Sequence, residues 1–449
     1  MHDPHAAAPT RHLSVPYVIF IAVGMVVGAG IFKSPALVAE NAGSVWAVYG
    51  VWILGGLISL MGALCYGELS TAYPSPGGDY YFLTKAYGPS FGFSFAWARA
   101  WARFSIINTG SIALLGFVIG DYLNLVWNLG PQGPALFALV SVMIMTLFNL
   151  RGTNGGKGAD YAITSLEVIG LLALAAAAAW LVIQTIPPAT TGPGHSPDAA
   201  GIGYALVFVL LAFGGWSEMS TLSAEIKNPE RGPGHGMVQA LLGSVVIITL
   251  LYLIANWALL RGLGIEGLAQ SKAPAADLMA RAFGPQAGIV LAIAVAAAAI
   301  TSINGTIIVG ARTTFAAARE RTGLNWIGSW DGKRGIPANA IIAQGIVSIG
   351  LVILGATYQG FATLVDYTAP VYWAFLTASG LAVIILRRKM PDQPRPFKVP
   401  LYPILPLAFA TSSALMLWSS LNYVKVGALF GLAVVGVGII LAVITKPQK

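Results

Sequence analysis

Residues 24–32 read Gly-Met-Val-Val-Gly-Ala-Gly-Ile-Phe and lie in the middle of the first long apolar stretch of the chain. Each glycine costs about 1 kcal/mol relative to alanine in a helix interior, so this stretch favours a break in the helix. Inside a membrane, irregular backbone is tolerated only where it is buried in protein or lines a cavity. The stretch therefore predicts a helix that is broken at mid-membrane depth, with main-chain N–H and C=O groups free to bind a ligand.

The composition is that of a polytopic membrane protein. The chain has 449 residues, of which 56% are hydrophobic and only 9% are charged. We predict an all-α integral membrane protein with about twelve transmembrane helices. Their expected positions are near residues 13–39, 44–72, 90–119, 134–150, 160–184, 202–226, 236–260, 286–318, 338–355, 359–387, 401–420 and 426–445.

The net charge of +8 follows the predicted topology. With both termini placed in the cytoplasm, most Lys and Arg residues fall in the cytoplasmic tails and loops, which is the asymmetry of the positive-inside rule. We therefore expect a multi-pass protein of the inner (plasma) membrane that contacts the lipid bilayer and no nucleic acid. Lys33 lies within the first span, and we expect its side chain to extend to the outer interface.

The sixth span carries a second break, Phe-Gly-Gly-Trp-Ser-Glu at residues 213–218. Spans one and six are five helices apart, so they cross the membrane in opposite directions, which is typical of an inverted five-helix repeat. For the glycines, the alternative is that they permit close helix packing. We predict three parts of the chain: a tail over 1–12, a transport core over 13–387 with repeats 13–184 and 202–387, and two peripheral helices with a short tail over 388–449.

The two breaks offer complementary partners for both charges of an α-amino acid. The half-helix that begins near Ala29 and Gly30 presents unpaired N–H groups and a positive dipole end, which suit a carboxylate. The half-helices that end near Val26 and Leu211 present carbonyl groups, which suit an ammonium. Glycine at position 28 or 30 lets a ligand approach the backbone without obstruction by a Cβ atom. The breaks therefore predict a site for a zwitterionic amino acid.

Seven motifs occur in order along the chain: GAGIF at 28–32, GALCYGEL at 62–69, PGGDY at 76–80, FGGW at 213–216, EIKNPER at 225–231, SING at 302–305 and ARE at 318–320. Together they resemble the amino acid–polyamine–organocation superfamily, and within it the L-type amino acid transporter branch. The resemblance implies a LeuT-type fold with broken helices 1 and 6. It also implies sodium-independent exchange or uptake of amino acids by alternating access.

The resemblance assigns roles to residues at the breaks. The candidate substrate-binding residues are Val26, Ala29, Gly30, Ile31, Leu211, Phe213, Gly214, Trp216 and Ser217. Ala29 and Gly30 would donate N–H groups to the substrate carboxylate. The carbonyls of Val26, Leu211 and Gly214 would receive the ammonium. The candidate gating residues are Leu211, which stands where the branch often has an aromatic gate, Asp366 and Tyr367.

Two acids are candidates for coupling or ion binding. The branch commonly has Thr-x-x-Lys in the fifth span, whereas this chain has Glu167 at the position of the lysine. A carboxylate inside a helix bundle is costly, so Glu167 is expected to carry a proton or to help bind a cation. A protonated Glu167 with one hydrogen bond in a packed core is the alternative. Glu218 is expected to select the substrate side chain or to cap a half-helix.

The single cysteine and the lack of catalytic motifs argue against a disulfide-linked partner, a metal site and enzymatic activity. The only cysteine is Cys65 in the second span, and residues 120–133 contain none. We therefore expect no disulfide-linked heavy chain, no metal site and no cofactor, and the oligomeric state stays open. No catalytic motif of the HExxH or GxSxG type occurs, so we predict that the chain is not an enzyme. The alternative within transport is an antiporter of polyamines or other organic cations, which the extra acids would suit.

Overall fold

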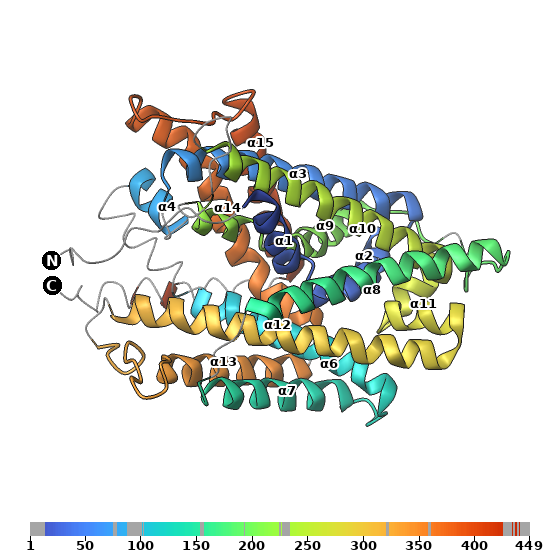
Figure 1. Cartoon of the computed structure of the whole chain (residues 1–449). Helices are drawn as coiled ribbons and strands as arrows, with labels where there is room; N and C mark the ends of the chain where they lie inside the picture. Colours follow the sequence, from blue (N-terminus) through green and yellow to red (C-terminus); the bar gives the residue numbers. More distant parts are fainter. Residues whose placement is uncertain are drawn as a thin grey trace.

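The computed structural model describes residues 14–424 except for 75–78, 88–100, 102, 153–156, 193, 224–225, 227–233, 320–322 and 358–360, and beyond 424 it describes residues 433, 436, 437 and 440. All of the named elements in this described part are helices. Figure 1 shows the long helices side by side, with their axes roughly parallel. The predicted all-α fold is confirmed.

Eleven described helices match predicted spans. Seven are long and apolar enough to cross a membrane: α3 (Val45–Ala72), α6 (Asn108–Val126), α10 (His235–Gln270), α12 (Pro285–Arg319), α13 (Ala338–Ala356), α14 (Phe361–Lys389) and α15 (Ile404–Val424). Shorter apolar segments belong to α1 (Val15–Val26), α7 (Gly133–Asn149), α8 (Lys157–Ile183) and α9 (Ala199–Ala212). The twelfth predicted span, 426–445, lies mostly outside the described residues.

Two short helices lie in no predicted span, and each marks one end of the bundle. They are α4 (Asp79–Tyr87) and α11 (Pro274–Phe283), and Figure 1 shows them at opposite ends of the long helices. Helix α11 begins with proline and carries Asp277 in its first turn and Arg281 in its last turn, all of which favour a helix at these positions. We refer below to the α4 end and the α11 end.

Both predicted breaks are present. The first span consists of α1, a 3₁₀ turn η1 (Ala29–Phe32) and α2 (Ser34–Ala42). Between α1 and η1 the backbone leaves the helix at Val27 and is extended at Gly28, with ψ of −179°. The sixth span consists of α9, a turn in which Gly215 has φ of +112°, and η3 (Trp216–Leu222). Only glycine adopts that φ readily, which explains why a glycine stands at this turn.

The two broken spans run in opposite directions. Helix α2, the second half of span one, packs against α9, the first half of span six. Helix α1 in turn contacts η3. Each first half therefore lies beside the second half of the other span, which is the arrangement that an inverted repeat requires.

The third span extends further than predicted. A π-helical segment η2 (Arg103–Ile107) leads into α6, which continues to Val126, whereas the sequence predicted an end at residue 119. The predicted end was too early because the helix continues past the charged residue Asp121. In the structure Asp121 pairs with Lys33, so its charge is neutralised within the bundle.

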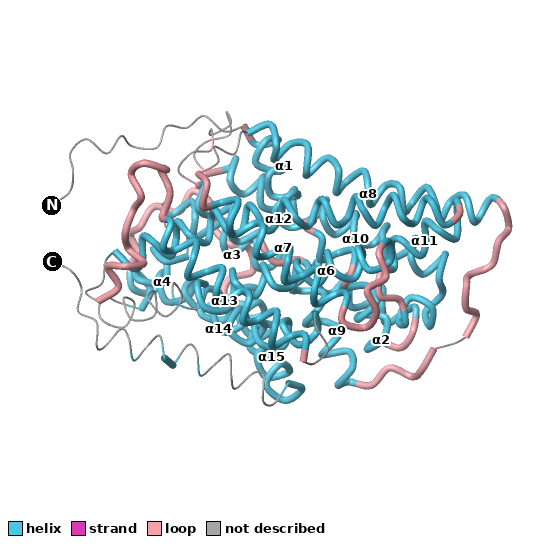
Figure 2. Tube along the Cα trace, turned by 90° about the horizontal axis from the view of Figure 1, so that it is seen from below, coloured by secondary structure: helices cyan, strands magenta, loops and turns pink. Residues whose placement is uncertain are grey.

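The α11 end is covered by the segment that joins α8 to α9. Figure 2 shows this segment running along that end of the bundle. Its Ala189 N–H donates to the carbonyl of Gly262 at 3.0 Å, and its Thr190 N–H donates to the carbonyl of Leu263 at 3.1 Å. His195 N–H donates to the carbonyl of Gly43 at 2.9 Å. The segment therefore joins α10 to the end of α2.

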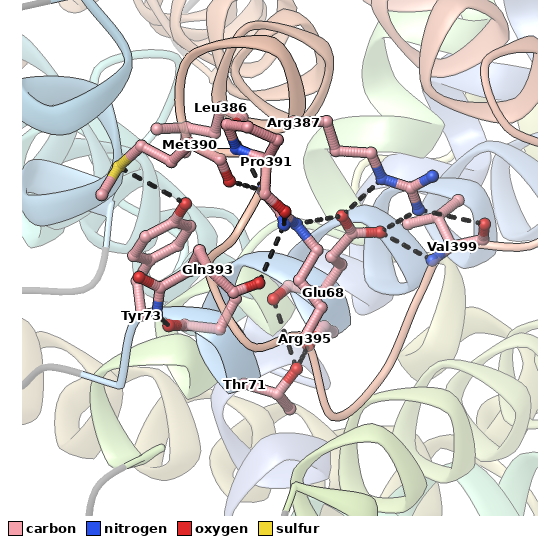
Figure 3. A network of polar contacts seen from close by, with 12 residues as sticks. Glu68, Thr71, Tyr73, Leu386, Arg387, Met390, Pro391, Gln393, Arg395 and Val399 are labelled. Atoms are coloured by element: carbon pink, nitrogen blue, oxygen red, sulfur yellow. Dashed lines mark hydrogen bonds and ion pairs between the residues drawn. The ribbon is translucent and has the colours of Figure 1, made fainter.

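At the α4 end, a buried carboxylate fastens α3 to the chain between α14 and α15 (Figure 3). Arg387 Nε donates to Glu68 Oε1 at 2.7 Å, and its Nη2 donates to Oε2 of the same carboxylate. The Val399 N–H donates to Oε2 at 2.7 Å, and Arg395 Nε lies 3.5 Å from Oε1. The Glu68 side chain is 3% exposed. This one carboxylate therefore joins α3 to the last turn of α14 and to the chain that follows it.

We predict that Glu68→Gln destabilises the protein. The substitution leaves the Arg387 and Arg395 guanidinium groups without their carboxylate, and the loss of one partner from a buried ion pair costs about 3–5 kcal/mol. Thermal unfolding of the detergent-purified protein measures the effect. Glu40→Gln, at an exposed position on α2, is the control and should melt like the parent. Equal melting of the two variants would contradict the assigned role of Glu68.

Candidate functional site

The broken stretch of span one has open space beside it. A Cβ atom built at Gly28 or at Gly30 meets no described atom within 4 Å. These two glycines are therefore not explained by close packing against a neighbouring helix. Space is therefore left beside their backbone, and the binding of a ligand there stays a prediction.

Other glycines of the bundle serve packing. A Cβ atom at Gly62 would lie 2.5 Å from the ring of Trp216, and one at Gly55 would lie 2.4 Å from the side chain of Val209. Both glycines belong to α3, which packs against the sixth span. The packing explanation therefore holds at Gly55 and Gly62 and fails at Gly28 and Gly30.

The 3₁₀ turn η1 leaves N–H groups available next to this space. Within and after the turn, Ile31 N–H bonds the carbonyl of Gly28 at 3.3 Å, and Lys33 N–H bonds the carbonyl of Gly30 at 3.0 Å. The N–H groups of Ala29 and Gly30 precede these bonds and have no carbonyl within the turn to receive them. They form the positive end of the turn.

Tyr252 of α10 joins the two breaks. Its hydroxyl group lies 2.9 Å from the carbonyl oxygen of Val26, the last residue of α1. It also lies 2.8 Å from the carbonyl oxygen of Ala212, the last residue of α9. A phenol donates one hydrogen, and each carbonyl has two lone pairs. The ends of both half-helices are therefore held together while acceptor capacity remains on their carbonyls.

The two predicted aromatic residues pack into the bundle. The ring of Phe213 lies 5.1 Å from that of Tyr252 and 6.2 Å from that of Trp52. The ring of Trp216 lies 5.1 Å from that of Tyr66 and approaches Gly62 of α3. Both rings thus hold the sixth span against its neighbours. Their contact with a substrate stays a prediction.

The remaining candidates occupy several environments. Ile31 and Ser217 are buried, and Leu211 is partly buried with its carbonyl accepting the N–H of Gly214 at 2.9 Å. Asp366 and Tyr367 lie in the first two turns of α14, and Glu218 lies in η3. The side chains of these last three residues are outside the described part of the structure, so their gating and selection roles stay predictions.

Glu167 of α8 is buried near the broken stretch. It is 2% exposed, and its Oε1 accepts a weak hydrogen bond from Ser302 of α12 at 3.4 Å. Its Oε2 has no hydrogen-bond partner among the described residues. Gly170, one turn further along α8, packs against the ring of Phe32 at the end of η1. A carboxylate with a free oxygen therefore lies close to the candidate site.

The Lys33 side chain, which the sequence predicted to extend to the outer interface, is paired inside the bundle near the α11 end. It is 11% exposed, and its Nζ lies 2.7 Å from Oδ2 of Asp121 on α6. Sequence reasoning missed both this partner and Tyr252. The signal for both was a polar group inside an apolar span, which is a functional hypothesis by default.

A metal site is absent from the described part of the structure. No group of three His, Cys, Asp or Glu side chains there could hold an ion. Cys65 is fully buried in α3, so it is not available for a disulfide with another chain.

The fold and the site define a membrane transporter. Two antiparallel spans, broken at neighbouring positions inside a bundle of apolar helices, are the mark of transporters with a mid-membrane binding site. The sequence model of the amino acid permease family matches residues 13–444, and the chain belongs to this family. The prediction of a transporter rather than an enzyme is confirmed.

Relatives within the family are amino acid transporters. The chain is 29% identical over 415 residues to Large neutral amino acids transporter small subunit 2 of Oryctolagus cuniculus, which covers 89% of this chain and 74% of the relative. It is 28% identical over 390 residues to b(0,+)-type amino acid transporter 1 of Mus musculus, covering 86% and 77%. It is 25% identical over 417 residues to the Serine/threonine exchanger SteT of Bacillus subtilis, covering 92% and 91%.

We predict that alanine is tolerated at one glycine and destabilises the protein at another. Gly30→Ala places a methyl group in open space and should change the free energy of unfolding by less than about 1 kcal/mol. Gly62→Ala forces a methyl group into the Trp216 ring and should cost about 1–3 kcal/mol. Thermal melting of the purified variants measures both. Equal destabilisation by the two substitutions would show that Gly30 also serves packing.

Proposed function

We propose that this chain is a secondary active transporter that exchanges amino acids across a membrane by alternating access. The observation that carries the proposal is the open space beside Gly28 and Gly30, next to the joined ends of α1 and α9. A substrate bound at this place would meet main-chain donors from η1 and main-chain acceptors from the ends of α1 and α9. That polarity fits a zwitterion.

The two charges of the substrate would bind at different breaks. The N–H groups of Ala29 and Gly30 receive the carboxylate, as anions bind at the N-termini of helices. The carbonyls of Val26, Leu211 and Gly214 receive the ammonium. Because all of these groups belong to the main chain, they recognise the part that every α-amino acid shares.

Selection among amino acids would fall to side chains around the site. The relatives named above include transporters of large neutral amino acids and an exchanger of serine and threonine. Ile31 is an apolar group and Ser217 a hydroxyl group at the two breaks, and both are buried. We assign neutral amino acids as the substrate class on this basis, with Glu218 as the residue that would admit a cationic side chain.

The α4 end would face the cytoplasm of the cell, at the plasma membrane. The last turn of α14 at this end carries Arg387, Arg388 and Lys389, and the last turn of α4 carries Lys85. Basic residues at the ends of spans are retained on the cytoplasmic side. Both termini would then be cytoplasmic.

A transport assay in liposomes tests the proposal. Purified protein is reconstituted, the liposomes are preloaded with one unlabelled amino acid, and labelled leucine, serine or threonine is offered outside without sodium. We expect uptake that depends on the internal amino acid. Gly30→Val fills the open space and should reduce uptake by about tenfold or more, as the loss of one head-group contact does.

Gly50→Val is the matched control for this assay. Gly50 also has open space around its Cβ position, but it is exposed on the side of α3. Uptake by this variant should equal that of the parent. Flux that no amino acid drives, but that putrescine or cadaverine drives, would replace the proposal with organic-cation transport. Dependence on sodium would refute the sodium-independent mechanism.

We further propose that Glu167 couples transport to protons. Its buried, half-partnered carboxylate can hold a proton in one step of the cycle and release it in another. In the same liposomes, an inward proton gradient should stimulate uptake by the parent protein. Glu167→Gln keeps the shape of the side chain without a titratable group, so its uptake should no longer respond to the gradient. Retention of the full response by this variant would contradict the coupling role.

A further inference from the structure

The second half of span one is fastened to α6 by two consecutive residues on each side. The hydroxyl group of Tyr122 donates to the carbonyl of Phe32 at 2.8 Å. The next residue of span one, Lys33, forms the ion pair with Asp121, the residue before Tyr122. Neither contact lies within one helix, so together they fix α2 relative to α6.

The Lys33–Asp121 pair is shielded from solvent. The two side chains are 11% and 13% exposed. Exposed ion pairs contribute little to stability, whereas the loss of one partner from a buried pair leaves an uncompensated charge. If α2 separates from α6, the ammonium of Lys33 and the carboxylate of Asp121 must therefore both become hydrated.

Lys33 also connects a third segment. Its Nζ donates to the main-chain carbonyl of Lys272 at 2.8 Å, and Lys272 lies two residues before the start of α11. One ammonium group thus holds α2, α6 and the start of α11 together. All three segments meet at the α11 end, on the far side of the break from α1.

The pair lies between the open space and the α11 end. Lys33 follows Gly30 by one turn of η1, and its own N–H closes that turn onto the carbonyl of Gly30. On the other side of the open space, the non-helical residues Val27 and Gly28 separate α2 from α1. Short non-helical segments of this kind absorb the rotation in hinge motions. Helix α2 can therefore move without α1, and the ion pair is one of the contacts that hold it, beside its packing against α9 and α10.

We propose that Lys33 and Asp121 form the gate on the α11 side of the site, and that breaking their ion pair opens the site from that side. The proposal rests on the transport function above. In the structure this gate is closed, since the pair is formed and Phe32 is bonded to Tyr122.

A cysteine-labelling experiment tests the gate without any substrate. Cys65→Ala removes the only native thiol, and Ser34→Cys places a probe at a 4% exposed position next to Lys33. The purified protein in detergent is treated with a polar maleimide, and the labelling rate is measured. With the gate closed, we expect slow labelling. Lys33→Gln and Asp121→Asn, each added alone, should raise the rate by about tenfold or more.

The exchange of the two charges is the decisive variant. Lys33→Asp combined with Asp121→Lys re-forms the pair and should return labelling to the slow rate. Glu40→Gln, on an exposed part of α2, should leave the rate unchanged. A slow rate in both single variants would overturn the proposal, as would a fast rate in the charge-exchanged variant. Because labelling needs no amino acid, a negative transport assay and a negative labelling assay are independent results.

Discussion

A helix that breaks inside a membrane has to find partners for the carbonyl groups that it frees, because no water in the hydrocarbon core can supply them. In this protein two helices break near each other. The hydroxyl group of Tyr252 lies within hydrogen-bond distance of the last carbonyl of α1 and of the last carbonyl of α9. That single side chain donates its one hydrogen between the two ends and holds them close together. The open space beside Gly28 borders the place where these two ends are held together.

The glycines illustrate how one residue type serves two purposes in the same bundle. In α3, Gly55 and Gly62 leave room for side chains of the sixth span, and the backbones approach closely. In the first span, Gly28 and Gly30 face space that no described atom fills. The difference lies entirely in what surrounds each glycine. A count of glycines in the sequence cannot distinguish the two.

The sequence was sufficient to predict the structure where the physical signal lies in neighbouring residues. Glycine at mid-span predicted both breaks, and the odd number of helices between them predicted their opposite directions. The sequence was insufficient where the partner is distant along the chain. Lys33 and Asp121 are 88 positions apart, and Glu68 and Arg387 are 319 positions apart. The sequence placed Lys33 at the outer interface, and only the packed bundle shows the ion pairs that these residues form. For the same reason, the rings of Phe213 and Trp216 could be placed at a break but not oriented.

The network around Glu68 has a consequence for the charge of the surface near it. Two guanidinium groups share one carboxylate, so the cluster keeps a net positive charge after all of its contacts are made. Arg388 and Lys389 follow Arg387 directly at the end of α14 and add to that charge. Anionic phospholipid headgroups are attracted to such basic clusters beside a span, each base contributing about 1 kcal/mol. The same residues that fasten the end of the bundle therefore give it an affinity for one leaflet of the membrane.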